Sequence, residues 1–308
     1  MIKKIIPVFV CMLCCTIASA QQKIDTIGQK IITLSEVVAN SKLNIPAFID
    51  RVKNDTTFYK AFKNLDIIGY TSLNDIRMMD KHNNTEASLY SKTKQTVQNG
   101  CRKMQTLQQQ TTGDFYNSDS SYNYYTAQMY ASLFFTKDSV CGENNIVAGR
   151  EFSTEGKSGI EKHKEQLKML FFDPGKKIPG IPFISGKTEI FDDNMAEKYD
   201  MNIDMDEFNK TSCYIFTITA KPEFKNDVVI DEMKTWFDDK TFEVVARNYS
   251  LSYDAGIYDF NVHMEVQLTH FGEYLVPSVI SYNGNWKLIF KSRERCVFTA
   301  TLFDYTNQ

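Results

Sequence analysis

Apolar and polar residues alternate without interruption from Asp259 to Thr269, and this is the most regular pattern in the chain. Successive side chains of a β-strand point to opposite faces of the sheet, so a period of two predicts a strand with one apolar face. We therefore expect a long strand here, in a sheet that has something packed on one side. The apolar side chains of this strand are Phe260, Val262, Met264, Val266 and Leu268.

Segments of the same kind flank this strand and predict an antiparallel sheet over the last third of the chain. Asn283-Gly284 suits a two-residue hairpin turn, because both central residues of the favoured turn need a positive φ. A second hairpin is predicted over residues 67–97, whereas residues 98–114, rich in Gln and Thr, are not assigned. The other predicted strands are Cys213–Ala220, Val228–Phe237, Phe242–Tyr253, Tyr274–Tyr282, Asn285–Phe290 and Arg295–Asp304.

Apolar residues with a helical period lie mainly near the N-terminus. Pro46 suits the first turn of a helix that carries Phe48 and Val52 on one face. Residues 54–57 can cap a further helix, with Phe58 and Phe62 on its inner side. Two more helices are predicted, at Leu34–Asn40 and Lys157–Phe171.

Together these elements predict an α+β fold that is mainly antiparallel β. We expect a curved sheet or half-barrel covered by the N-terminal and middle helices, because an apolar sheet face must be buried. Residues 21–308 are expected to form a single β-rich domain. An acidic connector makes residues 192–210 the candidate seam within it.

Residues 1–20 have the pattern of a secretory signal peptide. Basic residues precede a short apolar run, and Ala18-Ser19-Ala20 supplies small residues before the cleavage position. The alternative is a lipoprotein signal acylated at Cys15, but Leu13 and Cys14 before it make a poor match. We expect an exported protein that is periplasmic, outer-membrane associated or extracellular, and no later run has the roughly 20 apolar residues of a membrane helix.

The charge balance argues against one class of partner. The chain has 35 basic and 38 acidic residues, and loss of Lys3 and Lys4 with a signal peptide leaves 33 against 38. Proteins that bind nucleic acid depend on clustered cations. We therefore expect no nucleic-acid partner.

Four cysteines follow the predicted signal peptide. An even number in an oxidising compartment predicts two disulfides. We expect the pairs Cys101–Cys141 and Cys213–Cys296, each within one half of the chain, with buried free thiols as the alternative. No two of them have the spacing of a zinc-binding pair, so neither a metal site nor a cofactor is expected.

Motifs of catalytic or metal-binding loops are missing or incomplete. Gly-x-Ser-x-Gly and His-Glu-x-x-His do not occur. Asp200–Asp206 resembles a calcium loop but has Met205 where glycine is required. His263 and Glu265 share the polar face of the regular strand without a third partner. An enzyme is disfavoured, although carboxylates from distant loops leave a hydrolase open.

Trp236-x-Asp238-x-x-Thr241, with the order of helices, hairpin and antiparallel strands, resembles the LolA-type outer-membrane lipoprotein carriers. The whole also resembles exported proteins of Bacteroidetes-type bacteria with no assigned activity. The carrier resemblance implies a curved, unclosed sheet covered by helices, with lipid acyl chains held between them. The chain departs from that family by its length and by the segment 98–206.

These expectations lead to a binding function. An apolar cavity under the sheet would take a lipid or a lipidated protein, since burial of apolar area contributes about 25 cal/mol per Å². The alternatives are a non-enzymatic structural or protein-interaction module of the cell envelope, and a hydrolase with a non-local carboxylate site. The side chains expected to line the cavity are Phe48, Val52, Phe260, Val262, Met264 and Val266.

Overall fold

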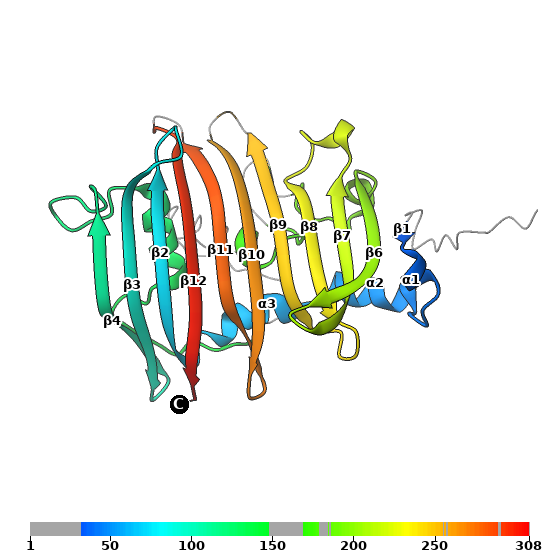
Figure 1. Cartoon of the computed structure of the whole chain (residues 1–308), viewed down its shortest axis with the longest axis horizontal. Coiled ribbons are helices and arrows are strands. Elements are labelled where there is room, and N and C mark those ends of the chain that lie inside the picture. The colour runs from blue at the N-terminus through cyan, green and yellow to red at the C-terminus, as the bar shows by residue number, and fades with distance from the viewer. Residues whose placement is uncertain are drawn as a thin grey trace, which may run out of the picture.

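One open sheet runs through the protein from edge to edge (Figure 1). The structure is a computed structural model, and it describes residues 32–147, 169–178, 184, 186–254, 256, 258–288 and 291–307. Within these ranges twelve strands follow the order β1-β6-β7-β8-β9-β10-β11-β12-β2-β3-β4-β5. The strands are β1 (Ile32–Leu34), β2 (Gly69–Met79), β3 (Thr85–Gln98), β4 (Cys101–Thr112), β5 (Ser139–Cys141), β6 (Tyr199–Phe208), β7 (Thr211–Ala220), β8 (Ile230–Asp238), β9 (Val244–Asp254), β10 (Tyr258–Phe271), β11 (Tyr274–Leu288) and β12 (Glu294–Thr306).

The regular strand of the sequence is β10, at the centre of a run of antiparallel strands. Val262 pairs with Leu251 of β9 and with Gly284 of β11. Its alternate residues are buried on one side, while Asn261 and Glu265 are exposed on the other. The predicted alternation is therefore confirmed.

The N-terminal hairpin extends the same sheet. β12 pairs with β2 in antiparallel register, with Phe298 opposite Ile76, so two strands far apart in the sequence lie side by side. The turn between β2 and β3 is held by Asp80, whose carboxylate accepts the backbone N–H groups of His82 and Asn84. Apart from β1, which lies parallel to β6, the pairs of described strands are antiparallel.

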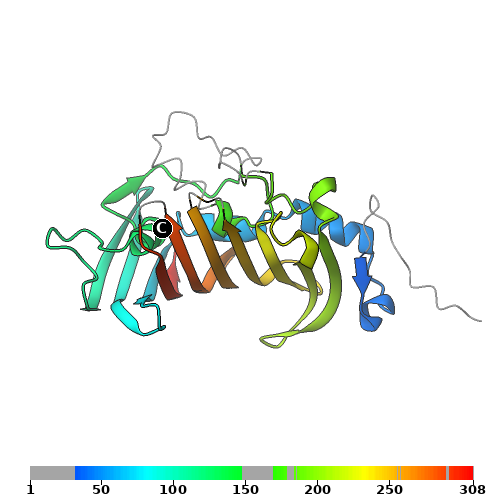
Figure 2. The same cartoon turned by 90° about the horizontal axis from the view of Figure 1, so that it is seen from above.

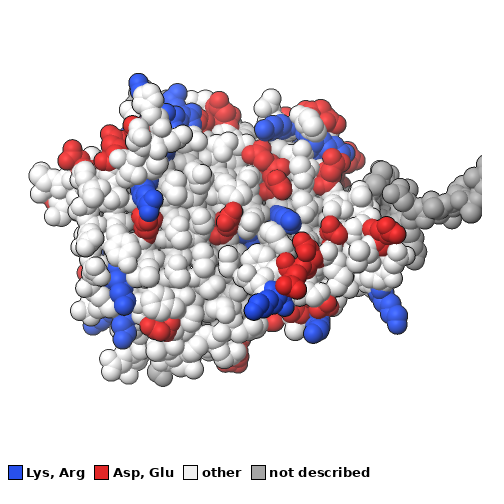
Figure 3. Space-filling view, in the orientation of Figure 1, with Lys and Arg blue, Asp and Glu red and all other residues white. Residues whose placement is uncertain are grey.

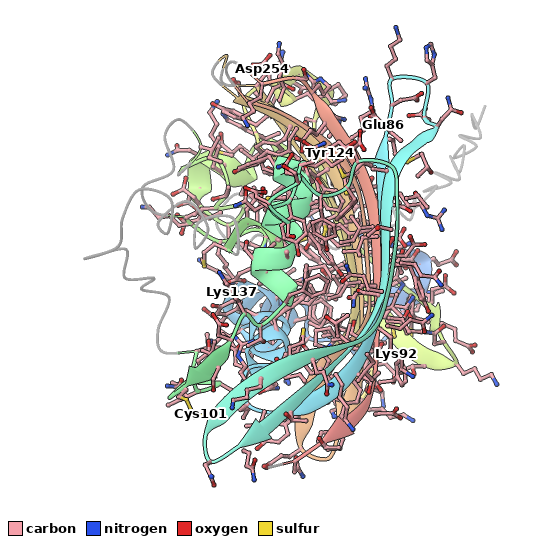
Figure 4. The ribbon with its side chains drawn as sticks, turned by 90° about the vertical axis from the view of Figure 1, so that its left-hand side faces the viewer. Glu86, Lys92, Cys101, Tyr124, Lys137 and Asp254 are labelled. Carbon is pink, nitrogen blue, oxygen red and sulfur yellow. A yellow bond between two sulfur atoms is a disulfide. The ribbon has the colours of Figure 1, made fainter. Side chains whose placement is uncertain are left out.

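Helices cover one face of the sheet and leave the other bare (Figures 2 and 4). Asn44 accepts the backbone N–H of Ala47 and caps the helix that carries Phe48, Ile49 and Val52 into the core. The sheet is curved, and the ends of β3 and β4 bend toward the helix side (Figure 4). The described helices are α1 (Glu36–Ala39), α2 (Ile45–Asn54), α3 (Thr57–Asn64), α4 (Tyr125–Phe134), α6 (Asp193–Ala196) and a 3-10 turn at Pro222–Phe224.

The predicted fold class, a mainly antiparallel α+β fold with a curved sheet covered by helices, is confirmed. One local prediction is wrong. Asn283-Gly284 makes no turn, because β11 continues through it from Tyr274 to Leu288. The acidic segment near residues 192–210 forms α6 and the strand β6 inside the sheet, and the single domain with a seam at this segment stays a prediction.

The unassigned segment 98–114 contains a hairpin turn and a strand. Asn99 and Gly100 have φ of 52° and 69°, the positive values that the favoured two-residue hairpin turn needs. β4 then pairs with β3 from Cys101 to Thr112. This strand lies next to the edge strand β5.

The cysteines form one of the two expected bridges. Cys101 and Cys141 are joined by a disulfide between β4 and β5. Cys213 and Cys296 are buried free thiols, so the second pairing is wrong. β7 and β12 are separated by four strands, and at about 4.8 Å per strand their α-carbons lie far beyond the roughly 7 Å that a disulfide spans.

Some predictions fall outside the described residues. These are the signal peptide 1–20, the lipidation alternative at Cys15, and most of the predicted helix Lys157–Phe171. A bilayer-spanning helix would need a length and an apolarity that no helix in the described ranges reaches. Within the same ranges, His, Cys, Asp and Glu side chains form no group of three that could hold a metal ion.

Candidate functional site

On the covered face of the sheet, the inward side chains are apolar at the centre and include polar groups toward the β4 end. Under α2 and α3 the inward side chains are apolar and closely packed. Under α4 the inward side chains of β2 and β3 include a polar group: Asn74 hydrogen bonds with Ser91 and Thr93 and accepts from the buried hydroxyl of Tyr130. Buried polar groups need partners, and this network supplies them. The polar end of the sheet is where the structure leaves room.

A pocket of about 300 Å³ opens at this end, between α3, α4 and β4. Its volume is at the lower limit of sites that bind small molecules. Figure 4 looks at this edge of the molecule, with α4 running from near Tyr124 along the inner side of the sheet. The lining residues are Tyr59, Phe62, Lys63, Leu65, Asp66, Tyr70, Arg102, Ser132, Leu133, Phe134, Phe135, Glu143 and Phe172.

Aromatic rings form one wall of the pocket. Phe62 of α3 stacks on Phe172 with ring centroids 4.1 Å apart, and Phe134 of α4 meets the same Phe172 edge-on at 5.7 Å. Offset and edge-to-face contacts are the arrangements that aromatic pairs prefer. This wall therefore joins α3, α4 and the segment 169–172 around an apolar surface.

Four charged side chains, those of Lys63, Asp66, Arg102 and Glu143, also line the pocket. The guanidinium of Arg102 holds both carboxylate oxygens of Glu143, Nη2 to Oε1 at 3.1 Å and Nε to Oε2. Its Nη2 lies 3.4 Å from Asp66, which also pairs with Lys63. Burial raises the pKa of Asp66 in spite of both cations. Burial acts to lower the pKa of Arg102, but the bond to Glu143 and the charge of Asp66 outweigh it and raise the pKa.

A second, much narrower void lies behind the aromatic wall. It holds about 10 Å³ and is lined on the sheet side by Met264, Tyr282 and Phe298. Leu133, Phe134 and Phe172 line both this inner gap and the outer pocket. These three side chains are therefore the partition between the pocket and the interior under α4.

The six residues predicted to line a cavity lie in the buried core. Met264 is the member that lines the inner gap. Phe48 packs against Tyr214, Phe237 and Phe242 under the other end of the sheet, and Phe260 stacks on Trp286. Val52, Val262 and Val266 are buried as well. Contact of these six with a ligand stays a prediction.

The pocket residues were missed because they come from separate segments. Asp66 follows α3, Arg102 is the second residue of β4, and Glu143 follows β5. One signal could have found two of them: Arg102 adjoins Cys101, and Glu143 is two residues after Cys141. The disulfide between these cysteines brings the two charges to one place.

His263 and Glu265 lie on the bare face, in a row with Ser250. Ser250 Oγ lies 2.9 Å from His263 Nδ1, and His263 Nε2 lies 3.2 Å from Glu265 Oε1. β10 is paired with both β9 and β11 along this stretch, so its backbone N–H groups are used in the hydrogen bonds of the sheet. A nucleophilic site needs free donors to stabilise an oxyanion. We interpret the row as a cross-strand polar contact.

The Trp236-x-Asp238-x-x-Thr241 pattern builds the turn between β8 and β9. Asp238 Oδ1 accepts the backbone N–H groups of Lys240 and Thr241, each at 2.8 Å. Phe242 then takes a φ of 59° and stacks on Tyr214 beside Phe48. The pattern therefore has a structural role: it turns the chain and brings Phe242 into contact with Phe48 of α2.

Comparisons with known proteins give a weak likeness to solved structures. No protein-family model matches the chain, and no curated protein matches it. A Vibrio parahaemolyticus domain described as an outer membrane lipoprotein-sorting protein is similar over 81% of this chain and 91% of its own, at 9% identity and a TM-score of 0.27. A DUF1329 family protein from Desulfovibrio piger is similar over 82% of this chain and 94% of its own, at 10% identity and a TM-score of 0.25. The first likeness agrees with the resemblance in the sequence, but at such TM-scores we infer the function from the chain's own residues.

Proposed function

We propose that this is an exported protein of the cell envelope that binds or carries a hydrophobic ligand, such as a lipid or the acyl chain of a lipoprotein. The ligand enters the pocket between α3, α4 and β4, and its chain extends under α4. One observation carries the proposal: the outer pocket and the inner gap share the partition of Leu133, Phe134 and Phe172. Movement of these side chains would join the two voids.

The inner gap is so small that a chain can enter it only by displacing the partition. The inner gap of about 10 Å³ holds no chain while the partition is closed. Each buried methylene contributes about 0.8 kcal/mol, so twelve carbons supply on the order of 10 kcal/mol before the costs of ordering. Micromolar affinity needs about 8 kcal/mol. The apolar contribution of a single chain is therefore of the same order as the free energy of micromolar binding, before these costs are subtracted.

The position of the partition supports such movement. Phe134 is the last residue of α4, where helix ends fray. Leu133 and Phe134 are partly exposed in the closed structure, whereas Tyr130 one turn earlier is fully buried. Rotation at the end of α4 would open the way to Met264 without disturbing the anchor at Tyr130.

A larger side chain in the partition tests the proposal. Leu133→Trp should block the passage and weaken the binding of dodecanol at least tenfold in a calorimetric titration. Leu107→Trp, an exposed position on β4, is the matched control and should bind like the wild type. Organic extracts of the purified protein should contain lipid by mass spectrometry. A protein that carries no lipid and binds no dodecanol would contradict the proposal, as would equal binding by the two tryptophan variants.

A second function, as a non-enzymatic protein-interaction module, is favoured by the edge of the sheet. β5 pairs only with Cys101–Lys103, so residues 104–112 of β4 present an unpaired edge among the described strands. This edge has no charged residue and exposes Leu107. Such an edge can accept a strand from another chain. Leu107→Lys should then abolish crosslinking to envelope partners and leave dodecanol binding unchanged.

A further inference from the structure

In this pocket a hydrogen-bonding edge of Arg102 that could bind a ligand is occupied by Glu143 of the same chain. The guanidinium of Arg102 is fixed by its other contacts: Nη1 donates to Thr136 at 2.6 Å and to Gln95 at 3.4 Å. Its remaining edge, Nε and Nη2, faces the pocket and holds the two oxygens of Glu143. A fixed guanidinium edge that binds a planar carboxylate through two parallel bonds is a recognition geometry for any carboxylate.

Glu143 and Asp66 are held differently on this arginine. Asp66 pairs with both Lys63 and Arg102, and its side chain is 18% exposed. Glu143 bonds to Arg102 and is 30% exposed at the pocket mouth. The backbone around it is anchored by the disulfide at Cys141 and by Asn145, whose amide donates to Asn64 at 2.8 Å. The Glu143 side chain can therefore rotate into water while its backbone stays in place.

The charge balance of the pocket decides which anion can enter. Lys63 and Arg102 are matched by Asp66 and Glu143, so the four groups are neutral together. An added anion would leave an uncompensated charge in a site where burial already raises the pKa of Asp66. If Glu143 leaves as the anion arrives, neutrality is kept. A ligand carboxylate would then take the same two bonds on Arg102.

We propose that the pocket binds the carboxylate of a single-chain fatty acid on Arg102, and that Glu143 is a built-in competitor for that position. The proposal rests on the function proposed above, since the chain of the acid would follow the aromatic wall past Phe62 and Phe134. A phosphate monoester can also pair with a guanidinium edge, but its charge of about −2 would upset the balance that a single carboxylate keeps. The exchange forms and breaks hydrogen bonds only.

The test compares two ligands with the same chain, dodecanoate and dodecanol, by calorimetric titration of the intact protein at pH 8. Glu143→Ala removes the competitor and should tighten dodecanoate about tenfold, with little change for dodecanol. Arg102→Lys keeps the charge but loses the two-bond edge, and should weaken dodecanoate about tenfold and dodecanol little. Arg77→Lys alters the exposed pair with Asp75 on β2 and is the matched control.

The outcomes separate this inference from the function on which it rests. Absence of dodecanol binding to the wild type would overturn both. Normal dodecanol binding, with no gain for dodecanoate in Glu143→Ala, would overturn this inference alone. The same holds if Arg102→Lys weakens both ligands equally, or if dodecyl phosphate binds the wild type more tightly than dodecanoate. Near-ultraviolet circular dichroism of each variant shows that the fold is retained before binding is compared.

Discussion

The phenol of Tyr282 lies directly over Gly284, two residues further along the same face of β11. A Cβ on Gly284 would stand 2.7 Å from the Tyr282 hydroxyl and 2.8 Å from its ring. The hydroxyl reaches past the glycine and accepts the indole N–H of Trp286 at 2.8 Å. The ring also stacks on Phe298, with centroids 4.5 Å apart. Gly284 is thus required for close packing with Tyr282, and it is not part of a turn.

Gly284→Ala is therefore expected to destabilise the protein. Tyr282 is 1% exposed and is held by Trp286 and Phe298, so it cannot move aside freely. Overpacking of this kind lowers the free energy of unfolding by about 1–3 kcal/mol. Gly186→Ala, where a Cβ would meet nothing within 4 Å, is the control and should be close to neutral. Urea denaturation measures both, and equal stabilities would contradict the packing role.

Asp238 gives the turn between β8 and β9 a dependence on pH. The hydrogen bond from the Thr241 backbone N–H, with that from Lys240, lowers the pKa of this carboxyl in the folded state. An acid whose folded pKa is depressed contributes stability above its unfolded pKa, and the contribution is lost as the pH falls through the folded pKa. Asp238→Ala should lower the free energy of unfolding by about 1 kcal/mol at pH 7, with a smaller deficit at pH 3.

Two variants frame this prediction. Asp238→Asn keeps an acceptor oxygen without a charge, so its deficit at pH 7 should be smaller than that of Asp238→Ala, and it should also shrink toward pH 3 as the wild type loses the charge. Asp239→Ala in the same turn is the matched control. Denaturation curves at pH 7 and pH 3 give the comparison, and a deficit for Asp238→Ala that grows toward acid pH would be the wrong sign.

The two free thiols are expected to be inert in the folded protein. Burial raises the pKa of Cys213 to about 11 and raises that of Cys296 further. The thiolate is the reactive form, and at pH 8 a pKa of 11 leaves roughly a hundredfold less of it than in an exposed cysteine. Iodoacetamide should label both residues only after unfolding, as read by peptide mass spectrometry. Rapid labelling of either residue in the native state would show that it is accessible.

The dipeptide Asn-Gly shows how far the sequence determines this fold. At Asn99-Gly100 it makes the hairpin turn, and at Asn283-Gly284 it lies in the middle of a strand. The local preference is the same at both places, and at the second it is overridden by the pairing of β11 with β10 on one side and β12 on the other. Strand periodicity predicted β10 and its neighbours because burial of one face acts on every second residue.

The candidate site was less predictable for a physical reason. Arg102 and Glu143 are 41 residues apart, and they meet because β5 pairs with the first residues of β4. A contact between residues so far apart in the sequence leaves no periodic pattern from which it could be predicted. The disulfide beside them, Cys101–Cys141, is the one local signal of it. The aromatic wall was hidden similarly, since Phe62, Phe134 and Phe172 come from three separate segments.

Arg247 and Asp55 form a buried ion pair that fixes the start of α3 to the sheet. Arg247 Nη2 lies 3.5 Å from Asp55 Oδ2, and its side chain is 6% exposed. The same guanidinium donates to Thr235 at 3.0 Å and lies over the ring of Phe58 at 4.3 Å. Burial lowers the pKa of Arg247, although the charge of Asp55 opposes this. Removal of one partner from such a pair leaves a buried charge uncompensated.

Arg247→Met should therefore lower the free energy of unfolding by about 3–5 kcal/mol, because methionine fills the space but leaves Asp55 without its counter-charge. Asp55→Asn added to Arg247→Met should restore much of the loss, since asparagine is neutral and can still accept the Thr57 N–H. Arg77→Met, in the exposed pair with Asp75, is the control and should cost less than about 1 kcal/mol. Urea denaturation of the wild type, Arg247→Met, Asp55→Asn and the double variant gives the double-mutant cycle. If the double variant lost as much as the two single changes added together, Asp55 and Arg247 would be acting independently.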